Sequence, residues 1–84
     1  MNYAVVFTYS FDDEMAVYLF ENESSAKDFL MSSYKEELRI DKEENGWNSI
    51  GVLSDDGWYA RITTPFFDHE DITELRIGCV YTKG

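Results

Sequence analysis

The only histidine, His69, lies in the acidic run Asp68-His69-Glu70-Asp71 and is the first candidate for chemistry near neutral pH. The neighbouring carboxylates favour its protonated form, and a histidine in a loop can serve as a general acid or base. Catalysis also needs a nucleophile or a donor to an oxyanion, and no other residue is marked for either role. We therefore interpret His69 as an exposed loop histidine, and we expect a protein without catalytic residues that is not an enzyme.

Cys79 is the only cysteine, so the chain can form neither an internal disulfide nor a cysteine-rich zinc site. It falls between Ile77 and Tyr81 in the apolar register of an alternating segment, which predicts a buried small side chain rather than a reactive thiolate. A single free thiol fits a reducing cytosol. The first residues also lack the basic start of a signal peptide and the apolar length of a membrane span. We expect a cytoplasmic protein that does not bind a membrane.

An oxygen-rich stretch partly matches an EF-hand calcium loop. The residues at its first, third, fifth, sixth, seventh and ninth positions are Asp41, Glu43, Asn45, Gly46, Trp47 and Ser49. The twelfth position, where the loop needs a bidentate carboxylate, holds Val52, and no amphipathic helix follows. We interpret the stretch as a solvated acidic loop, and we expect no metal and no cofactor.

The most informative feature for binding is the charge, because seventeen Asp and Glu against seven Lys and Arg give these 84 residues a formal net charge of −10. Affinity for phosphate comes from basic side chains that displace counterions, so this charge opposes direct binding of nucleic acid and attracts basic partners. The acids concentrate in predicted turns and at the end of the predicted helix, near aromatic side chains. The candidate partner-binding residues are Asp12, Asp13, Glu43, Glu44, Trp47, Asp55, Asp56, Tyr59, Asp68, Glu70 and Asp71. The alternative is that the charge only keeps the protein soluble.

The elements that must position these residues are predicted by hydrophobic periodicity. Strands are expected at residues 3–10, 15–20, 49–53, 58–64 and 72–81, with turns at 11–14 and at the hairpin signal 54–57. The pattern predicts an α+β fold, an antiparallel β-sheet of about five strands with one helix packed on one face, in the order β-β-α-β-β-β. No linker or repeat divides the chain, so residues 1–84 are expected to form a single domain.

The predicted helix begins after an N-cap sequence at residues 22–25. Its apolar stripe consists of Ala26, Phe29, Leu30, Tyr34 and Leu38. We expect this stripe to pack on Val5 or Val6, Ile62 and Ile77.

The end of the helix is ambiguous because the same stripe, when continued, brings Glu37, Asp41 and Glu44 to the core-facing side. The helix therefore either ends near Arg39 or projects past the sheet as far as residues 45–46, where the glycine suits the position after a helix. We favour a frayed projection.

One helix cannot cover the predicted sheet, because five strands about 4.8 Å apart span about 19 Å between the outer axes and a helix is about 10 Å across. The rest of the apolar face has to be closed by the loop at Phe66-Phe67, by strong curling of the sheet, or by a second chain. A homodimer is therefore one of the expected states.

Two runs of the sequence, residues 37–47 and 55–63, resemble small acidic proteins encoded in bacterial mobile elements and prophages. The resemblance extends over nearly the whole chain and brings no assigned activity or site residues. It implies a role in conflict between a mobile element and its host, where small acidic inhibitors of restriction or CRISPR nucleases are a familiar type. We therefore expect a non-enzymatic, acidic protein-interaction domain that inhibits a basic host protein or mimics nucleic acid toward it. The alternatives are a self-associating structural domain and, third, a small hydrolase or metal-dependent enzyme.

Overall fold

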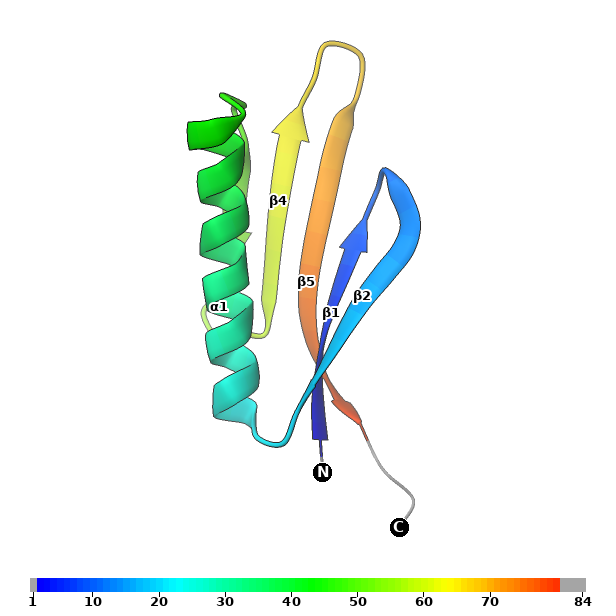
Figure 1. Cartoon of the computed structure of the whole chain (residues 1–84), viewed down its shortest axis with the longest axis vertical. Helices are drawn as coiled ribbons and strands as arrows, with labels where there is room; N and C mark the ends of the chain where they lie inside the picture. The colour runs from blue at the N-terminus through cyan, green and yellow to red at the C-terminus, as the bar shows by residue number, and fades with distance from the viewer. Residues whose placement is uncertain (1, 81–84) are drawn as a thin grey trace.

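The protein is an antiparallel five-stranded sheet with one long helix against one of its faces, as the sequence patterns predict (Figure 1). The structure is a computed structural model that describes residues 2–80, so Tyr81, where the last predicted strand ends, lies outside the described residues. The elements are β1 (Asn2–Tyr9), β2 (Asp12–Phe20), α1 (Glu23–Arg39), the π-helical turn η1 (Ile40–Glu44), β3 (Ile50–Leu53), β4 (Tyr59–Pro65) and β5 (Glu70–Val80). The strand order is β2-β1-β5-β4-β3, and every neighbouring pair is antiparallel.

The first turn is shorter than predicted. β2 begins at Asp12, so the turn consists of Ser10 and Phe11 rather than residues 11–14. The side chain of Asp12 accepts a 3.0 Å hydrogen bond from the backbone N–H of Glu14. This bond is an Asx turn and accompanies the irregular register between Thr8 and Tyr9, whereas the pairing of Tyr9 with Asp12 places the acidic residues at the start of the return strand.

α1 begins at the capping residue that the sequence indicates. The side-chain oxygen of Asn22 accepts a 2.8 Å hydrogen bond from the backbone N–H of Ser25, which satisfies one of the free donors of the first turn. Behind this cap Ala26 and Leu30 of the predicted stripe are fully buried, and Phe29 and Tyr34 pack against the core. Leu38 was also expected there, but it lines a surface hollow with Lys35, Arg39 and Lys42. No helix within residues 2–80 has the length and apolar character needed to cross a membrane.

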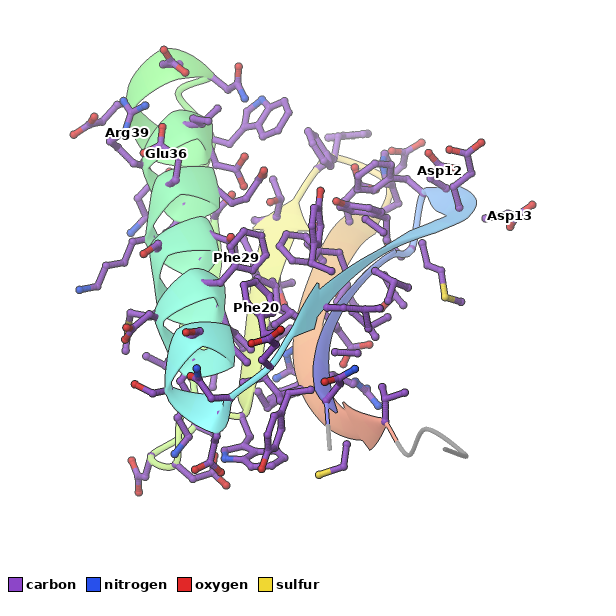
Figure 2. The ribbon with its side chains drawn as sticks, turned by 60° about the horizontal axis from the view of Figure 1, so that its bottom comes forward. Asp12, Asp13, Phe20, Phe29, Glu36 and Arg39 are labelled. Carbon is purple, nitrogen blue, oxygen red and sulfur yellow. The ribbon has the colours of Figure 1, made fainter. Side chains whose placement is uncertain are left out.

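The core lies between α1 and the central strands. Val5, Ile62 and Ile77 are all buried on the helix side, and Leu30 is 0 % exposed, so the predicted register of helix and sheet is confirmed. Phe29 fills the space between α1 and β2 together with Phe20 (Figure 2), with the two ring centroids 5.1 Å apart.

The helical path does not end at Arg39 but widens into η1, where the backbone N–H of Asn45 bonds to the carbonyl of Ile40 at 3.0 Å. Gly46 follows with a φ of 68°, the left-handed conformation predicted for the residue after a helix. The extension is not a frayed projection, because Asp41 is held against the sheet by hydrogen bonds.

The predicted burial of Cys79 is wrong. Cys79 faces the same side of β5 as Ile77, as strand alternation requires, but it is exposed because the last residues of β5 diverge from α1 (Figure 1). The loop at Phe66-Phe67 is one of the three expected ways to close the rest of the apolar face, and Phe67 does not contribute to it: Phe67 is fully exposed at 106 %, and Phe66 packs against Trp47.

Candidate partner-binding cleft

One end of the molecule collects most of the acidic side chains. α1, β1 and β4 run in the same direction, so their last residues meet there with the first residues of β2, β3 and β5 (Figure 1). The carboxylates at this end are Asp12, Asp13, Glu14, Glu36, Glu37, Asp41, Glu43, Glu44, Asp68, Glu70 and Asp71. Against these eleven carboxylates the described residues there offer Lys35, Arg39, Lys42 and a single histidine. This region, the acidic end, therefore carries most of the net charge of −10.

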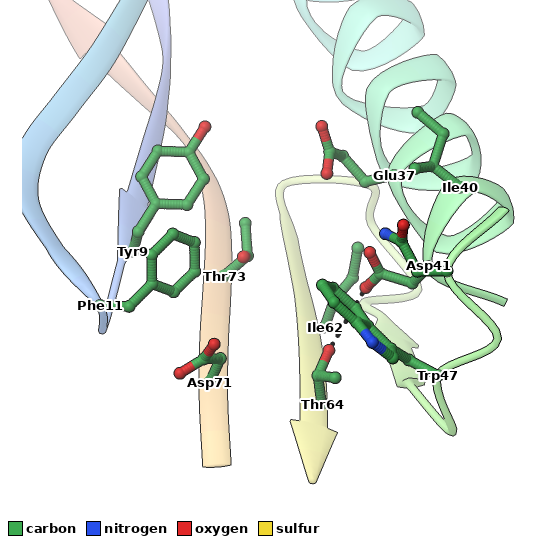
Figure 3. A pocket seen from close by; sticks show the side chains of 11 residues that line it. Tyr9, Phe11, Glu37, Ile40, Asp41, Trp47, Ile62, Thr64, Asp71 and Thr73 are labelled. Carbon is green, nitrogen blue, oxygen red and sulfur yellow. Dashed lines mark hydrogen bonds between the residues drawn. The ribbon is translucent and has the colours of Figure 1, made fainter. Parts of the chain in front are cut away.

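A cleft of about 290 Å³ opens at the acidic end between η1 and the sheet (Figure 3). Tyr9 and Phe11 form one wall, with their ring centroids 5.4 Å apart, and Trp47 lies on the opposite wall. The lining consists of Tyr9, Phe11, Glu37, Ile40, Asp41, Asn45, Trp47, Ile62, Thr64, Asp71 and Thr73. Three aromatic rings and three carboxylates thus share one cleft.

Asp41 is fixed in the cleft by two hydroxyl groups. Its Oδ2 accepts a 2.8 Å hydrogen bond from the hydroxyl of Ser49 and a longer one, 3.3 Å, from that of Thr64. The two hydroxyl oxygens lie 2.6 Å apart, and both residues are buried. This network attaches η1 to the start of β3 and the end of β4, and it leaves the second oxygen of Asp41 for another donor.

The electrostatics of the cleft are dominated by negative charge. Burial raises the pKa of the Glu37 carboxyl group, and the carboxylates of Asp41 and Glu36 raise that pKa further. The pKa of the Tyr9 hydroxyl is raised first by its own burial and then by the charge of Glu37. Negative charge in partly desolvated surroundings explains both shifts. A cation entering the cleft would therefore be attracted by several groups at once.

A row of rings continues from the Trp47 wall into the loop between β4 and β5. Phe66 meets Trp47 edge-on at 5.3 Å and stacks on His69 at 5.0 Å between ring centroids. Nδ1 of His69 lies 2.6 Å from Oδ1 of Asp68, and Nε2 lies 3.4 Å from Oδ1 of Asp71. The hydrogen bond to Asp68 raises the pKa of His69, and the charges of both aspartates act in the same direction. His69 thus holds the carboxylates of this loop in place.

The chemistry that this arrangement can perform is recognition of an organic cation. Guanidinium and ammonium groups form charge-assisted hydrogen bonds with carboxylates and lie favourably over aromatic faces. None of the described residues that line the cleft is basic, and His69 contacts one of its three carboxylates, Asp71, from outside the lining. Within residues 2–80, no group of three His, Cys, Asp or Glu side chains is arranged to hold a metal ion.

The residues predicted to bind a partner fall into four groups. Trp47 and Asp71 line the cleft, and Asp12, Asp13, Glu43, Glu44, Asp68 and Glu70 lie at the acidic end outside it. Figure 2 shows that Asp12 and Asp13 point away from the helix. Asp55 and Asp56 lie in the turn between β3 and β4 at the opposite end, and Tyr59 lies on the sheet face away from α1, where its hydroxyl donates to Glu74.

Sequence reasoning missed the aromatic wall formed by Tyr9 and Phe11. Tyr9 lies near the end of the predicted strand 3–10 and Phe11 in the predicted turn, so an exposed aromatic residue in a turn was the one available signal. Their position opposite Trp47 depends on the order of the strands, which no local pattern reports.

Comparison with known proteins gives no match, whether to models of protein families, to curated proteins or to solved structures. The cleft and the distribution of charge are therefore the observations from which a function is inferred.

Proposed function

We propose that this protein is a non-enzymatic binding domain that captures a basic partner protein at its acidic end. In this proposal one arginine or lysine side chain of the partner enters the cleft and lies between the wall of Tyr9 and Phe11 and the wall of Trp47. The observation that carries the proposal is the convergence of three carboxylates and three aromatic rings in a cleft without a basic side chain among its described lining residues.

The size of the cleft supports a single side chain as its occupant. Pockets for drug-sized ligands measure about 300–1,000 Å³, and this cleft, at about 290 Å³, lies at the lower limit. A cation over an aromatic face contributes about 0.5–2 kcal/mol, and a hydrogen bond to a charged group about 1.5–3 kcal/mol. One cationic side chain would therefore anchor the complex, while the surrounding acids attract the rest of a basic surface.

The same distribution of charge favours a partner that handles nucleic acid. A groove that binds phosphate groups is basic, and an acidic end with exposed aromatic faces offers it both the charge and the flat surfaces of a nucleic acid. We propose that the protein competes with nucleic acid for such a groove and so inhibits its partner. The resemblance to small acidic proteins of mobile elements fits this role.

The experiment that tests the proposal measures binding of a fluorescent arginine-rich peptide at several salt concentrations. We expect affinity to fall as salt rises, because the attraction between exposed charges is screened. Glu44→Lys at the acidic end should slow association several-fold, since charges at the rim of an interface act mainly on the association rate.

Asp55→Lys is the matched control, because it makes the same change of charge at the opposite end of a molecule 49 Å long. With a Debye length of about 8–10 Å, this distant change should leave association almost unaltered. Equal effects of the two substitutions would contradict the proposal. So would tighter binding to duplex DNA than to the peptide at physiological salt without a divalent ion.

A further inference from the structure

The face of the sheet opposite α1 is covered by none of the residues 2–80. Cross-strand pairing places on this uncovered face a set of exposed aliphatic side chains from the two edge strands, Met15, Val17, Leu19, Ile50 and Val52. Val17 at the middle of β2 is 52 % exposed. Apolar groups in this number on one side of a sheet are typical of an interface rather than of a solvated surface.

The uncovered face also differs from the rest of the molecule in charge. The charged side chains at its centre are Glu74, Arg61 and Arg76, so it carries a slight positive excess in a protein of net charge −10. The hydroxyl of Tyr59 donates to Glu74, and the guanidinium group of Arg76 lies 2.8 Å from the same carboxylate. Little uncompensated charge would have to be desolvated to cover this face.

The side chains of the uncovered face form rows that run across the strands, because direct cross-strand partners point to the same side. One row joins Met15, Thr8, Glu74, Arg61 and Val52. The next row, two residues along each strand, joins Val17, Val6, Arg76 and Tyr59. Three members of the first row have a complementary neighbour at the same strand position of the second row: Met15 has Val17, Glu74 has Arg76, and Arg61 has Tyr59.

We propose that two copies of this chain pack face to face through the uncovered face, about a twofold axis that runs across the strands between these two rows. This axis exchanges the rows, so Glu74 of each copy faces Arg76 of the other, and Met15 faces Val17. A self-complementary surface of this kind is what an isologous dimer requires. The inference is independent of the proposed binding at the acidic end, and it leaves both clefts accessible.

Electrostatics select this axis over the alternatives. A twofold axis parallel to the strands would bring the two acidic ends side by side, whereas the proposed axis places them at opposite poles of the dimer. Pairing of two β2 edges in antiparallel fashion would set the acids at residues 12–14 against those at 21 and 23. Both alternatives place like charges next to each other and are therefore disfavoured.

The area available is enough for a weak dimer. Five strands about 4.8 Å wide and about seven residues of 3.3 Å give the face roughly 500 Å² per copy. Two copies would bury roughly 1,000 Å², which is about the lower limit for a specific interface. We therefore expect a dimer that depends on protein concentration.

Sedimentation equilibrium of the complete chain tests the proposal. The wild-type mass should rise from 9.8 kDa toward twice that value as concentration increases. The rise should persist or strengthen at high salt, because salt screens the repulsion between two chains of like charge. Val17→Lys should keep the protein monomeric over the same range. Because this change makes the chain less acidic, its effect cannot come from added repulsion between negative charges.

Phe67→Lys is the matched control, since it introduces the same charge at an exposed apolar side chain outside this face and should dimerise like the wild type. Arg76→Glu should abolish dimerisation, and the charge swap Glu74→Arg with Arg76→Glu should restore it. Circular dichroism shows whether each variant folds, and Leu19→Lys serves in place of Val17→Lys if the latter does not. A wild-type chain that stays monomeric overturns the proposal, also where the face binds a different protein. A dimer that persists in both Val17→Lys and Leu19→Lys overturns it as well.

Discussion

At the scale of single residues, Glu37 is a carboxyl group of the cleft whose ionised form is unfavourable in the folded state. Its carboxyl group is half-buried on the sheet side of α1, and burial together with Asp41 and Glu36 raises its pKa above the usual range. A carboxyl group with a raised pKa in the folded state holds its proton more tightly than in the unfolded chain. Stability is therefore lost as pH rises from the ordinary range of a glutamate through the raised pKa of the folded state.

This linkage predicts the effect of Glu37→Gln. The substitution should increase the free energy of unfolding at neutral pH, because it removes a charge that is costly there, and the gain should disappear below the ordinary pKa of a glutamate. Urea unfolding at several pH values measures it. Glu36→Gln is the control. A hydrogen bond from Arg39 lowers the pKa of Glu36, so the folded state favours the ionised carboxylate, and replacing Glu36 should not stabilise the protein at neutral pH. A lower stability of Glu37→Gln at neutral pH would contradict this account.

Asp41 illustrates what could not be predicted at this scale. Its place on the core-facing side of the helix follows from helical periodicity, and that much was expected. Its function as an anchor depends on Ser49 and Thr64, which lie eight and twenty-three residues further along the chain. A sequence pattern reports neighbours on one element, so a hydrogen-bond network between three elements leaves no local signal.

At the scale of elements, α1 is the part of the fold that the sequence predicts best. Its N-cap and its stripe are local features, and the structure confirms them in Asn22 and Leu30. The burial of Cys79 was predicted wrongly because alternation along β5 reports only the side to which a residue points. Whether α1 covers that position depends on the path of the strand relative to the helix.

The packing of α1 predicts the cost of Leu30→Ala. Leu30 is 0 % exposed, and removal of a fully buried leucine side chain costs about 2–5 kcal/mol, through lost transfer free energy and the cavity left behind. Chemical denaturation monitored by circular dichroism measures this loss. Phe67→Ala is the control, because that side chain is fully exposed and its removal should leave the free energy of unfolding nearly unchanged. A similar small effect at both positions would show that the helix does not pack as described.

At the scale of the whole molecule, topology converts a dispersed set of acids into one acidic end. The sequence shows the charge and assigns most of it to turns, but the meeting of these turns follows from the strand order β2-β1-β5-β4-β3. That order pairs the first strand with the last, a contact between residues more than sixty positions apart. Asp55 and Asp56 were grouped with the other acids in the sequence, and only the topology separates them from the cleft.

The two proposed surfaces lie on different parts of the molecule and are compatible. The uncovered face would join two copies, while the acidic ends remain at opposite poles with their clefts open. A dimer of this form would present two binding sites to a partner with two basic segments, and linked sites raise the overall affinity without any new contact.

The measurement that tests the central claim most directly is an NMR titration of the isotope-labelled chain with a short arginine-glycine peptide. The same peptide with citrulline in place of arginine is the control, because citrulline keeps the shape of the side chain without its charge. We predict saturable chemical-shift changes at the residues of the cleft, led by Tyr9, Glu37 and the Trp47 indole, with the arginine peptide alone. Equal changes with the citrulline peptide, or changes confined to the turn at Asp55 or to the uncovered face of the sheet, would contradict the account.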